Sequence, residues 1–244
     1  MSEEALIVVD VQNDYFPDGN LPTWNPIETA EACAQLIQKF RQDGKQVVFV
    51  KHIIHDSQAE IFPALIKGTR GAEIHDIVKP LPTEKIITKH EVSSFVGTDL
   101  KEYLVSKGVK KLVVVGMMIH NCVNATVYSG VEEGFPCIVV EEAVNTMDQP
   151  YDGELVKAQD IKKAFLAGIQ FSFSKAYKLQ DVLSDNYEYQ CFSKLKNFVK
   201  KHPLESKEAL CKEGSYEISK SDCEGWVRHS ISFSERCMKM GTNL

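Results

Sequence analysis

The sequence predicts a three-layer α/β/α, Rossmann-like domain built on a central, mostly parallel sheet of six strands. Short apolar runs rich in β-branched residues alternate with helical patterns from the start of the chain to about residue 183. These runs are too apolar for strands with one face in water. Continuous apolar runs are typical of parallel strands covered by helices on both faces. Such sheets have right-handed crossovers and bind ligands beyond the carboxyl ends of their strands. We therefore expect chemistry at strand ends.

Each predicted strand is a short run that contains Val, Ile or Phe. The six runs are Ala5–Asp10, Gln46–Lys51, Lys85–Thr88, Lys111–Val115, Pro136–Val140 and Gln170–Ser174. The segments between them contain apolar residues at helical spacing, and Gly44 closes the first helix. The predicted helices are Pro26–Asp43, Thr98–Ser106, Asn121–Glu133 and Leu155–Gly168.

The last sixty residues differ in composition from the rest of the chain. Residues 185–244 are rich in Lys, Glu and Ser and contain no apolar run that could form a buried strand. The spacing of Phe192, Leu195, Phe198 and Val199 predicts one amphipathic helix. We therefore divide the chain into an α/β domain over 1–184 and a C-terminal helical appendage of unknown role over 185–244.

Charge and composition exclude several classes of partner. The formal net charge is −6 and there is no basic patch, which argues against binding to nucleic acid. No apolar run reaches the length of a membrane span. The acidic start Met1-Ser2-Glu3-Glu4 is not how a signal peptide begins, so we expect a cytoplasmic location. The seven cysteines include no C-x-x-C pair, and their odd number favours free thiols.

Three reactive side chains are expected at one rim of the sheet. Asp10 ends the first strand, Lys89 ends the third, and Cys122 opens the helix after the fourth. The helix dipole and the ammonium group of Lys89 would both favour the nucleophilic thiolate of Cys122. Asp10 could take the thiol proton and deliver it to a leaving amine, while backbone N–H groups over 116–122 stabilise the intermediate's negative oxygen. This set predicts a cysteine hydrolase that cleaves an amide-type C–N bond.

Four segments together resemble the isochorismatase-like cysteine hydrolases, a superfamily that includes nicotinamidases, N-carbamoylsarcosine amidases, ureidoacrylate amidohydrolases and streptothricin hydrolase. The segments are 9–16 (VDVQNDYF), 68–74 (GTRGAEI), 89–95 (KHEVSSF) and 116–123 (GMMIHNCV), and the resemblance covers about residues 5–183.

The resemblance implies a role for each member of the set. Asp10 would be the general base, Lys89 the residue that stabilises the thiolate, and Cys122 the nucleophile that forms a thioester. It also implies a cis peptide bond between Met117 and Met118, with the backbone amides of Met118 and Cys122 as the oxyanion hole. Relatives commonly assemble through this fold, so we expect a homo-oligomer.

The chain departs from the nicotinamidases at the metal site that these enzymes carry after the second strand. Residues 51–56 read KHIIHD, so that His52 stands where they have Asp and Ile54 stands where they have His. Two histidines from one strand end, His52 and His55, are a weak indication of a metal site. We therefore expect no metal and no cofactor, and nicotinamide becomes an unfavoured substrate.

Four further residues are candidates for contact with a small amide-type substrate. Phe16 follows the Asp10 strand, where family members place an aromatic residue against the substrate, although a core position is the alternative. His120 either faces the pocket or packs under its loop. Trp24 and Arg70 lie in loops that we expect at the same rim. The sequence leaves open whether the substrate is a ureido, carbamoyl, lactam or simple amide compound.

Other functions remain as alternatives. A non-catalytic member of the fold could serve in binding or assembly, but it would not need this particular set of three residues. True isochorismatases cleave a vinyl ether, and the presence of Cys122 favours acyl transfer instead. A redox-sensing thiol at Cys122 would need a resolving cysteine, and Cys137 should lie at the opposite end of the sheet.

Overall fold

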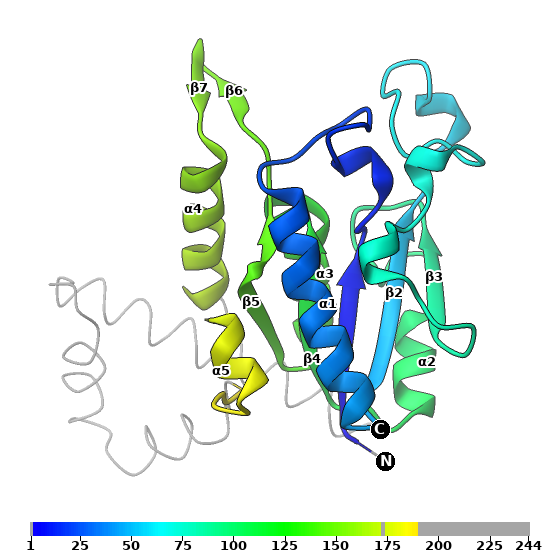
Figure 1. Ribbon diagram of the computed structural model, residues 1–244, viewed down its shortest axis with the longest axis vertical. Helices are drawn as coiled ribbons and strands as arrows, with labels where there is room; N and C mark the ends of the chain where they lie inside the picture. Colours follow the sequence, from blue (N-terminus) through cyan, green and yellow to red (C-terminus); the bar gives the residue numbers. More distant parts are fainter. Residues whose placement is uncertain (1, 172–173, 190–244) are drawn as a thin grey trace, which may run out of the picture. The chain divides into compact units, whose positions relative to one another are not determined.

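The apolar runs form one sheet of six parallel strands in the order β3-β2-β1-β4-β5-β8 (Figure 1). The computed structural model describes residues 2–171 and 174–189. The strands of this sheet are β1 (Glu4–Val9), β2 (Gln46–His52), β3 (Lys85–Lys89), β4 (Lys111–Met117), β5 (Cys137–Asn145) and β8 (Lys175–Tyr177). Both central strands, β1 and β4, are almost entirely buried because helices cover both faces of the sheet. The predicted α/β/α fold is confirmed.

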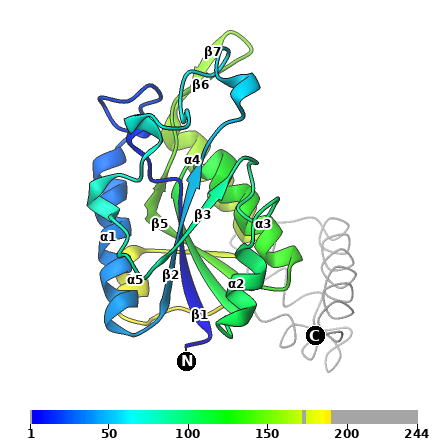
Figure 2. The same ribbon diagram turned by 90° about the vertical axis from the view of Figure 1, so that its right-hand side faces the viewer.

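The helices form the two outer layers (Figures 1 and 2). One face carries α1 (Pro26–Gln42) and α5 (Leu179–Leu183), and the other carries α2 (Leu100–Ser106), α3 (Asn124–Glu132) and α4 (Ala158–Phe171). Short 3-10 turns lie at Asn13–Tyr15, Asp56–Gln58, Arg70–Ala72 and Asp76–Val78. In α1 the buried side chains recur at helical spacing, and Pro26 occupies the first turn, where its missing N–H costs nothing.

The parallel register brings the carboxyl ends of four strands together. Val9 pairs with Val50 on one side and with Gly116 on the other, and His52 pairs with Lys89. Gly116 has a φ of 117°, and a Cβ there would lie 2.0 Å from the carbonyl oxygen of Val9. Only glycine lets β4 approach β1 so closely, and this contact positions the loop that follows β4.

The region after β5 differs from the sequence prediction. The helix begins at Ala158 rather than Leu155, because Glu154–Val156 (β7) pairs antiparallel with Gln149–Tyr151 (β6) in a separate hairpin. The same helix runs to Phe171, so the strand predicted over Gln170–Ser174 is wrong and its place in the sheet is taken by β8. Buried Ile161, Leu166 and Ile169 continue the helical period and override the β propensity of the phenylalanines that follow.

The described part of the predicted appendage packs on the domain. The Tyr187 hydroxyl donates to Glu4 Oε2 at 2.9 Å, the Tyr189 hydroxyl donates to the same carboxylate, and Lys39 lies 2.9 Å from Asp185. The division at 184 stays a prediction, and the amphipathic helix predicted from Phe192 lies outside the described residues. None of the described helices is long and apolar enough to cross a membrane.

Candidate active site

Four strands each supply one polar side chain to a single cluster at the carboxyl edge of the sheet. Asp10 directly follows β1, His52 ends β2, Lys89 ends β3, and Cys122 lies in the π-helical turn Ile119–Val123 that connects β4 to α3. The structure therefore assembles the three residues predicted from the sequence. It adds His52, which the sequence had suggested only as a weak metal ligand.

Lys89 lies at the centre of the cluster. Its Nζ is 2.9 Å from Asp10 Oδ2, 3.3 Å from Cys122 Sγ and 3.1 Å from His52 Nδ1. Two backbone carbonyl oxygens of the next loop each lie 3.1 Å away. The side chains of Lys89 and Asp10 are fully buried, and Cys122 is almost so. A buried ammonium group is tolerated only when it is paired and hydrogen-bonded, and these contacts meet that requirement.

The Asp10 carboxylate is poorly supplied with hydrogen-bond donors. Apart from the ion pair with Lys89 and the interaction through which it raises the pKa of Cys122, its oxygens have no hydrogen-bond partner within residues 2–171 and 174–189. Its backbone has a φ of 51°, in the left-handed region that non-glycine residues rarely adopt. Buried acceptors without donors are rare in folded proteins and call for an explanation such as proton transfer. The side chain is thus available to accept a proton.

Three influences act on the pKa of the Cys122 thiol. Burial raises the pKa of Cys122 most strongly, Asp10 raises it further, and Lys89 acts in the opposite direction. Lys89 thus acts in the direction that the sequence analysis expected, while burial and the nearby carboxylate act against it. Burial acts to lower the pKa of Lys89, but Asp10 and Cys122 outweigh it and the pKa is raised.

The loop that carries Cys122 begins with an unusual peptide bond. The bond between Met117 and Met118 is cis, as the resemblance implied. The carbonyl oxygen of Met118 accepts hydrogen bonds from the N–H groups of Asn121 at 3.0 Å and Val123 at 3.2 Å, which fixes the turn around Cys122. The assignment of the Met118 and Cys122 amides as an oxyanion hole stays a prediction.

Of the adjacent aromatic residues Tyr15 and Phe16, Tyr15 is the one whose pKa is influenced by the cluster. Phe16 belongs to the hydrophobic core and stacks on His75 with 3.7 Å between the ring centroids, which is the alternative position considered above. The pKa of Tyr15 is raised by burial and then by electrostatic interactions with Asp10 and Cys122, so its phenol lies within their electrostatic reach. Tyr15 and Phe16 are adjacent in the VQNDYF segment, and no periodic pattern in the sequence indicates which of them faces the site.

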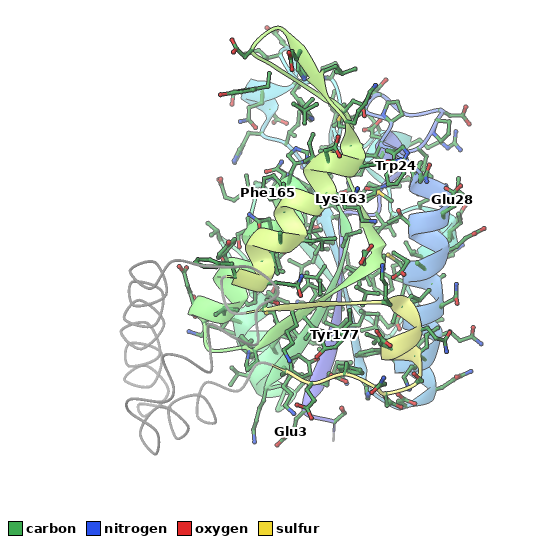
Figure 3. The ribbon with its side chains drawn as sticks, turned by 90° about the vertical axis from the view of Figure 1, so that its left-hand side faces the viewer. Glu3, Trp24, Glu28, Lys163, Phe165 and Tyr177 are labelled. Atoms are coloured by element: carbon green, nitrogen blue, oxygen red, sulfur yellow. The ribbon has the colours of Figure 1, made fainter. Side chains whose placement is uncertain are left out.

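The other three candidates fall into two places. His120 Nδ1 is hydrogen-bonded to Thr146 Oγ1. The backbone N–H of Trp24 donates to the backbone carbonyl of Thr146 at 2.8 Å. The His120 ring also meets Phe165 of α4 edge-on at 6.1 Å, and burial lowers the pKa of His120. Figure 3 shows Trp24 and Phe165 toward the carboxyl end of the sheet, with Glu3 at the opposite end. Arg70 is exposed and lines a separate hollow that contains none of the four cluster residues.

The cluster does not fit a metal ion. Asp10, His52 and Cys122 offer ligand atoms that all lie within 4.8 Å of one another. Lys89 Nζ lies within 3.3 Å of an atom of each, so that an ammonium group takes the place a cation would need. At the position where nicotinamidases have a second metal ligand, the buried side chain of Ile54 offers no donor atom.

The described cysteines offer no neighbour that would act as a redox partner of Cys122 at this rim. Cys137 begins β5 and pairs with Leu112 near the start of β4, at the opposite end of the sheet as expected. Its thiol contacts the carbonyl oxygen of Phe135 at 3.2 Å. Cys33 lies in α1, where burial raises its pKa to about 12.

The protein is thus a three-layer α/β/α protein in which Asp, Lys and Cys side chains meet at the carboxyl edge of a six-stranded parallel sheet. The isochorismatase domain family matches residues 4–172, and the chain belongs to this family. YddQ, an isochorismatase family protein of Bacillus subtilis, is 44% identical over 165 residues, which cover 68% of this chain and 90% of that protein. The secreted isochorismatase effector Isc1 of Verticillium dahliae is 33% identical over 74% of this chain and 90% of its own length.

Solved structures agree with this assignment. A crystal structure from Oleispira antarctica, regarded as an isochorismatase hydrolase, has a TM-score of 0.70 and 34% identity, covering 75% of this chain and 99% of that one. N-carbamoylsarcosine amidase from Thermoplasma acidophilum has a TM-score of 0.61 and 26% identity, covering 73% and 97%.

More distant relatives differ in their reported activity. Streptothricin hydrolase of Streptomyces noursei is 30% identical over 60% of this chain and 56% of its own length. A protein of Arabidopsis thaliana, regarded as an inactive nicotinamidase, is 29% identical over 56% of this chain and 76% of its own length. The superfamily is therefore one of hydrolases, in which the presence of activity has to be judged from the site.

Proposed function

We propose that this protein is a metal-independent cysteine amidohydrolase that cleaves an amide, ureido or lactam C–N bond of a small molecule through a thioester. The observation that supports this most strongly is the buried contact of one ammonium group, that of Lys89, with both the Asp10 carboxylate and the Cys122 thiol. A binding protein would have no need for this combination at the centre of its fold. We further propose a cytoplasmic homo-oligomer that requires no cofactor and binds neither nucleic acid nor membrane.

The first half of the reaction transfers the acyl group to sulfur. Asp10 takes the Cys122 proton as the sulfur attacks the carbonyl carbon, and the negative charge moves to the carbonyl oxygen. The C–N bond then breaks, and Asp10 returns the proton to the leaving nitrogen. Burial and Asp10 raise the pKa of Cys122, which favours transfer of the thiol proton to Asp10 during the attack.

The second half restores the enzyme. Asp10, again a carboxylate, takes a proton from a water molecule that attacks the thioester carbon. The C–S bond breaks, the sulfur leaves as a thiolate next to Lys89, and Asp10 returns the proton to it. The sum is addition of water across the C–N bond, with the amine or ammonia and the carboxylic acid as products.

The test is a panel of small primary amides, carbamoyl compounds and lactams. Ammonia release is measured for the first two groups and ring opening for the third. The Cys122→Ala variant is the negative control, and Cys33→Ala is the matched control because Cys33 is another buried thiol, located in α1. We expect turnover with at least one compound that is lost only in Cys122→Ala. Turnover that persists in that variant would contradict the proposal.

A rival function is binding without catalysis, as the inactive Arabidopsis relative suggests. Iodoacetamide distinguishes the two, provided that labelling is followed on the peptide that contains Cys122. A catalytic thiol beside Lys89 should label much faster than Cys33, which has no cation next to its sulfur among the contacts that the structure describes. Equal rates at the two cysteines would favour the binding protein.

A further inference from the structure

His52 belongs to the buried cluster, although the proposed reaction gives it no task. Its Nδ1 lies 3.1 Å from Lys89 Nζ and 3.7 Å from Cys122 Sγ, so it touches two of the three residues in the scheme. By contrast, His55, three residues further on, is exposed and meets Glu91 at the surface. The two histidines of the KHIIHD segment therefore have different environments and need different explanations.

The hydrogen-bond partner of Nε2 determines the tautomer of His52. Nε2 lies 3.1 Å from the backbone carbonyl oxygen of His90, which can only accept a hydrogen bond. Nε2 must therefore carry the hydrogen, and in the neutral ring Nδ1 presents a lone pair. Burial and then the charge of Lys89 lower the pKa of His52, which favours this neutral form. The lone pair points to the Lys89 ammonium group, which can donate to it.

A second buried side chain fixes the backbone of His52. The Gln12 side chain is fully buried, and its Oε1 accepts the His52 N–H at 2.8 Å while its Nε2 donates to the His52 carbonyl at 2.9 Å. The same Nε2 donates to the Ala72 carbonyl at 2.8 Å. These bonds tie the ends of β1 and β2 together and hold the His52 ring in place. They also give a physical reason for Gln12 in the segment that follows Asp10.

We propose that His52 is a positioning residue of this active site, which holds the Lys89 ammonium group at the distance where it stabilises the Cys122 sulfur. A lysine side chain has many rotamers, and its ammonium group has three hydrogens to share. Asp10 accepts one of these hydrogens and His52 accepts another. The third ammonium hydrogen is then directed to the Cys122 sulfur and the two nearby backbone carbonyls. The inference rests on the proposed role of the Cys122 thiolate.

The experiment measures the rate of Cys122 alkylation by iodoacetamide against pH in the full-length chain. Mass spectrometry of the peptide that contains Cys122 separates this thiol from the six other cysteines. We expect His52→Leu to raise the apparent pKa of Cys122 and to slow labelling at neutral pH about tenfold, the rate equivalent of one pKa unit. His52→Asn, whose carboxamide can place an oxygen near the position of Nδ1, should recover most of the rate. His55→Gln is the matched surface control and should change nothing.

A double-mutant cycle with Lys89 separates positioning from a general packing effect. Lys89→Met should itself raise the pKa of Cys122, and in that background His52→Leu should add no further shift, because residues that act through one another are not additive. The inference is overturned if His52→Leu leaves the profile unchanged, or if it shifts the profile equally with and without Lys89.

A further pair of variants covers the case in which leucine disturbs folding. Thermal unfolding is recorded for each protein, and if His52→Leu has lost its cooperative transition, His52→Gln replaces it. Glutamine is polar and similar in length, but its end group reaches the place of Nε2 rather than Nδ1, so it should behave as Leu does while Asn does not. Equal labelling by the Gln and Asn variants would overturn the inference. Labelling needs no substrate, so the inference and the proposed amidase activity can fail separately.

Discussion

Strand β1 has a buried carboxylate at each end, and the two have opposite surroundings. Glu4, at its start, receives hydrogen bonds from the hydroxyls of Tyr187 and Tyr189 and forms an ion pair with Lys45 at 2.9 Å. The pKa values of both tyrosines are raised by burial and then by the charge of Glu4, so their protons stay on the phenols and are donated to it. Glu4 is thus supplied with donors on every side.

Among the described residues, Asp10, just past the other end of β1, interacts with Lys89 through an ion pair and with the Cys122 thiol. A satisfied buried carboxylate holds neighbouring segments together, and protonating it would break its hydrogen bonds. Asp10 has fewer hydrogen bonds to lose when it takes a proton, and the interaction that weakens is its ion pair with Lys89. The difference fits the proposed roles, in which Glu4 stabilises the fold and Asp10, just after the same strand, transfers a proton.

Replacing each acid by its amide should give the largest effects, on turnover for Asp10 and on stability for Glu4. Asp10→Asn should lower turnover by roughly 10²–10⁴-fold, as is typical for the loss of a general acid–base group. Its Cys122 should ionise more readily, because Asp10 raises the pKa of that thiol. Glu4→Gln should keep normal turnover but lose about 1–3 kcal/mol of unfolding free energy, because two tyrosine donors and Lys45 lose a charged acceptor. Steady-state kinetics and urea unfolding measure the two effects.

Near-normal turnover in Asp10→Asn would contradict the division of roles. The proton would then travel by another route, with His120 as the first residue to substitute. A Glu4→Gln variant of unchanged stability would show instead that the tyrosine contacts contribute nothing to folding.

A smaller effect should come from shortening the chain at two points. All three predicted catalytic residues and every predicted strand precede Asp185, so the sequence predicts that residues after about that point are dispensable for the chemistry. In the structure, however, Tyr187 and Tyr189 carry hydroxyl donors for Glu4. A chain that ends at Tyr189 should fold and label at Cys122 as the full chain does. One that ends at Asp185 should be less stable by about 1–3 kcal/mol for each lost hydrogen bond to a charged group, with the same labelling rate while folded. Loss of labelling in the longer chain would show that residues beyond 189 complete the site.

The site residues that the sequence could predict are those that lie at the ends of predicted strands. Asp10, Lys89 and Cys122 were found because each marks the end of a strand or the start of the next helix, and parallel strands bring such ends together. His52 ends β2 in the same way, but the comparison with nicotinamidases directed attention to metal binding. Its position at the carboxyl end of a parallel strand predicts His52 at this edge of the sheet just as it predicts Lys89.

Other features had no signal at the level of sequence. Phe16 and Tyr15 are adjacent aromatics in a short turn, where no helical or strand period tells which one faces the site. The final strand of the sheet was misplaced because the helical period of α4 runs into an apolar, phenylalanine-containing stretch. The donors to Glu4 come from nearly two hundred residues further along the chain, a distance over which sequence pattern predicts no contact.

The smallest expected effect is that of a chelator. Asp10, His52 and Cys122 could form a metal site if they were free, because their ligand atoms lie within 4.8 Å of one another. In this protein the Lys89 ammonium group lies among them, so we expect turnover and Cys122 labelling to survive EDTA, with less than one equivalent of zinc or iron by metal analysis. Loss of activity on chelation, with recovery when metal is added, would overturn this expectation.

The matched variant for that experiment is Lys89→Met. It removes the cation and leaves a carboxylate, an imidazole and a thiol around the space, a ligand set that suits zinc. We expect this variant to take up more zinc than the wild-type protein at the same free concentration, and to lose it to EDTA. Asp10 would then become the ligand of a metal instead of the partner of an ammonium group, whereas Glu4, with its own donors unchanged, should stay as it is. Equal zinc content in the two proteins would show that the three residues cannot close around a metal even when Lys89 is gone.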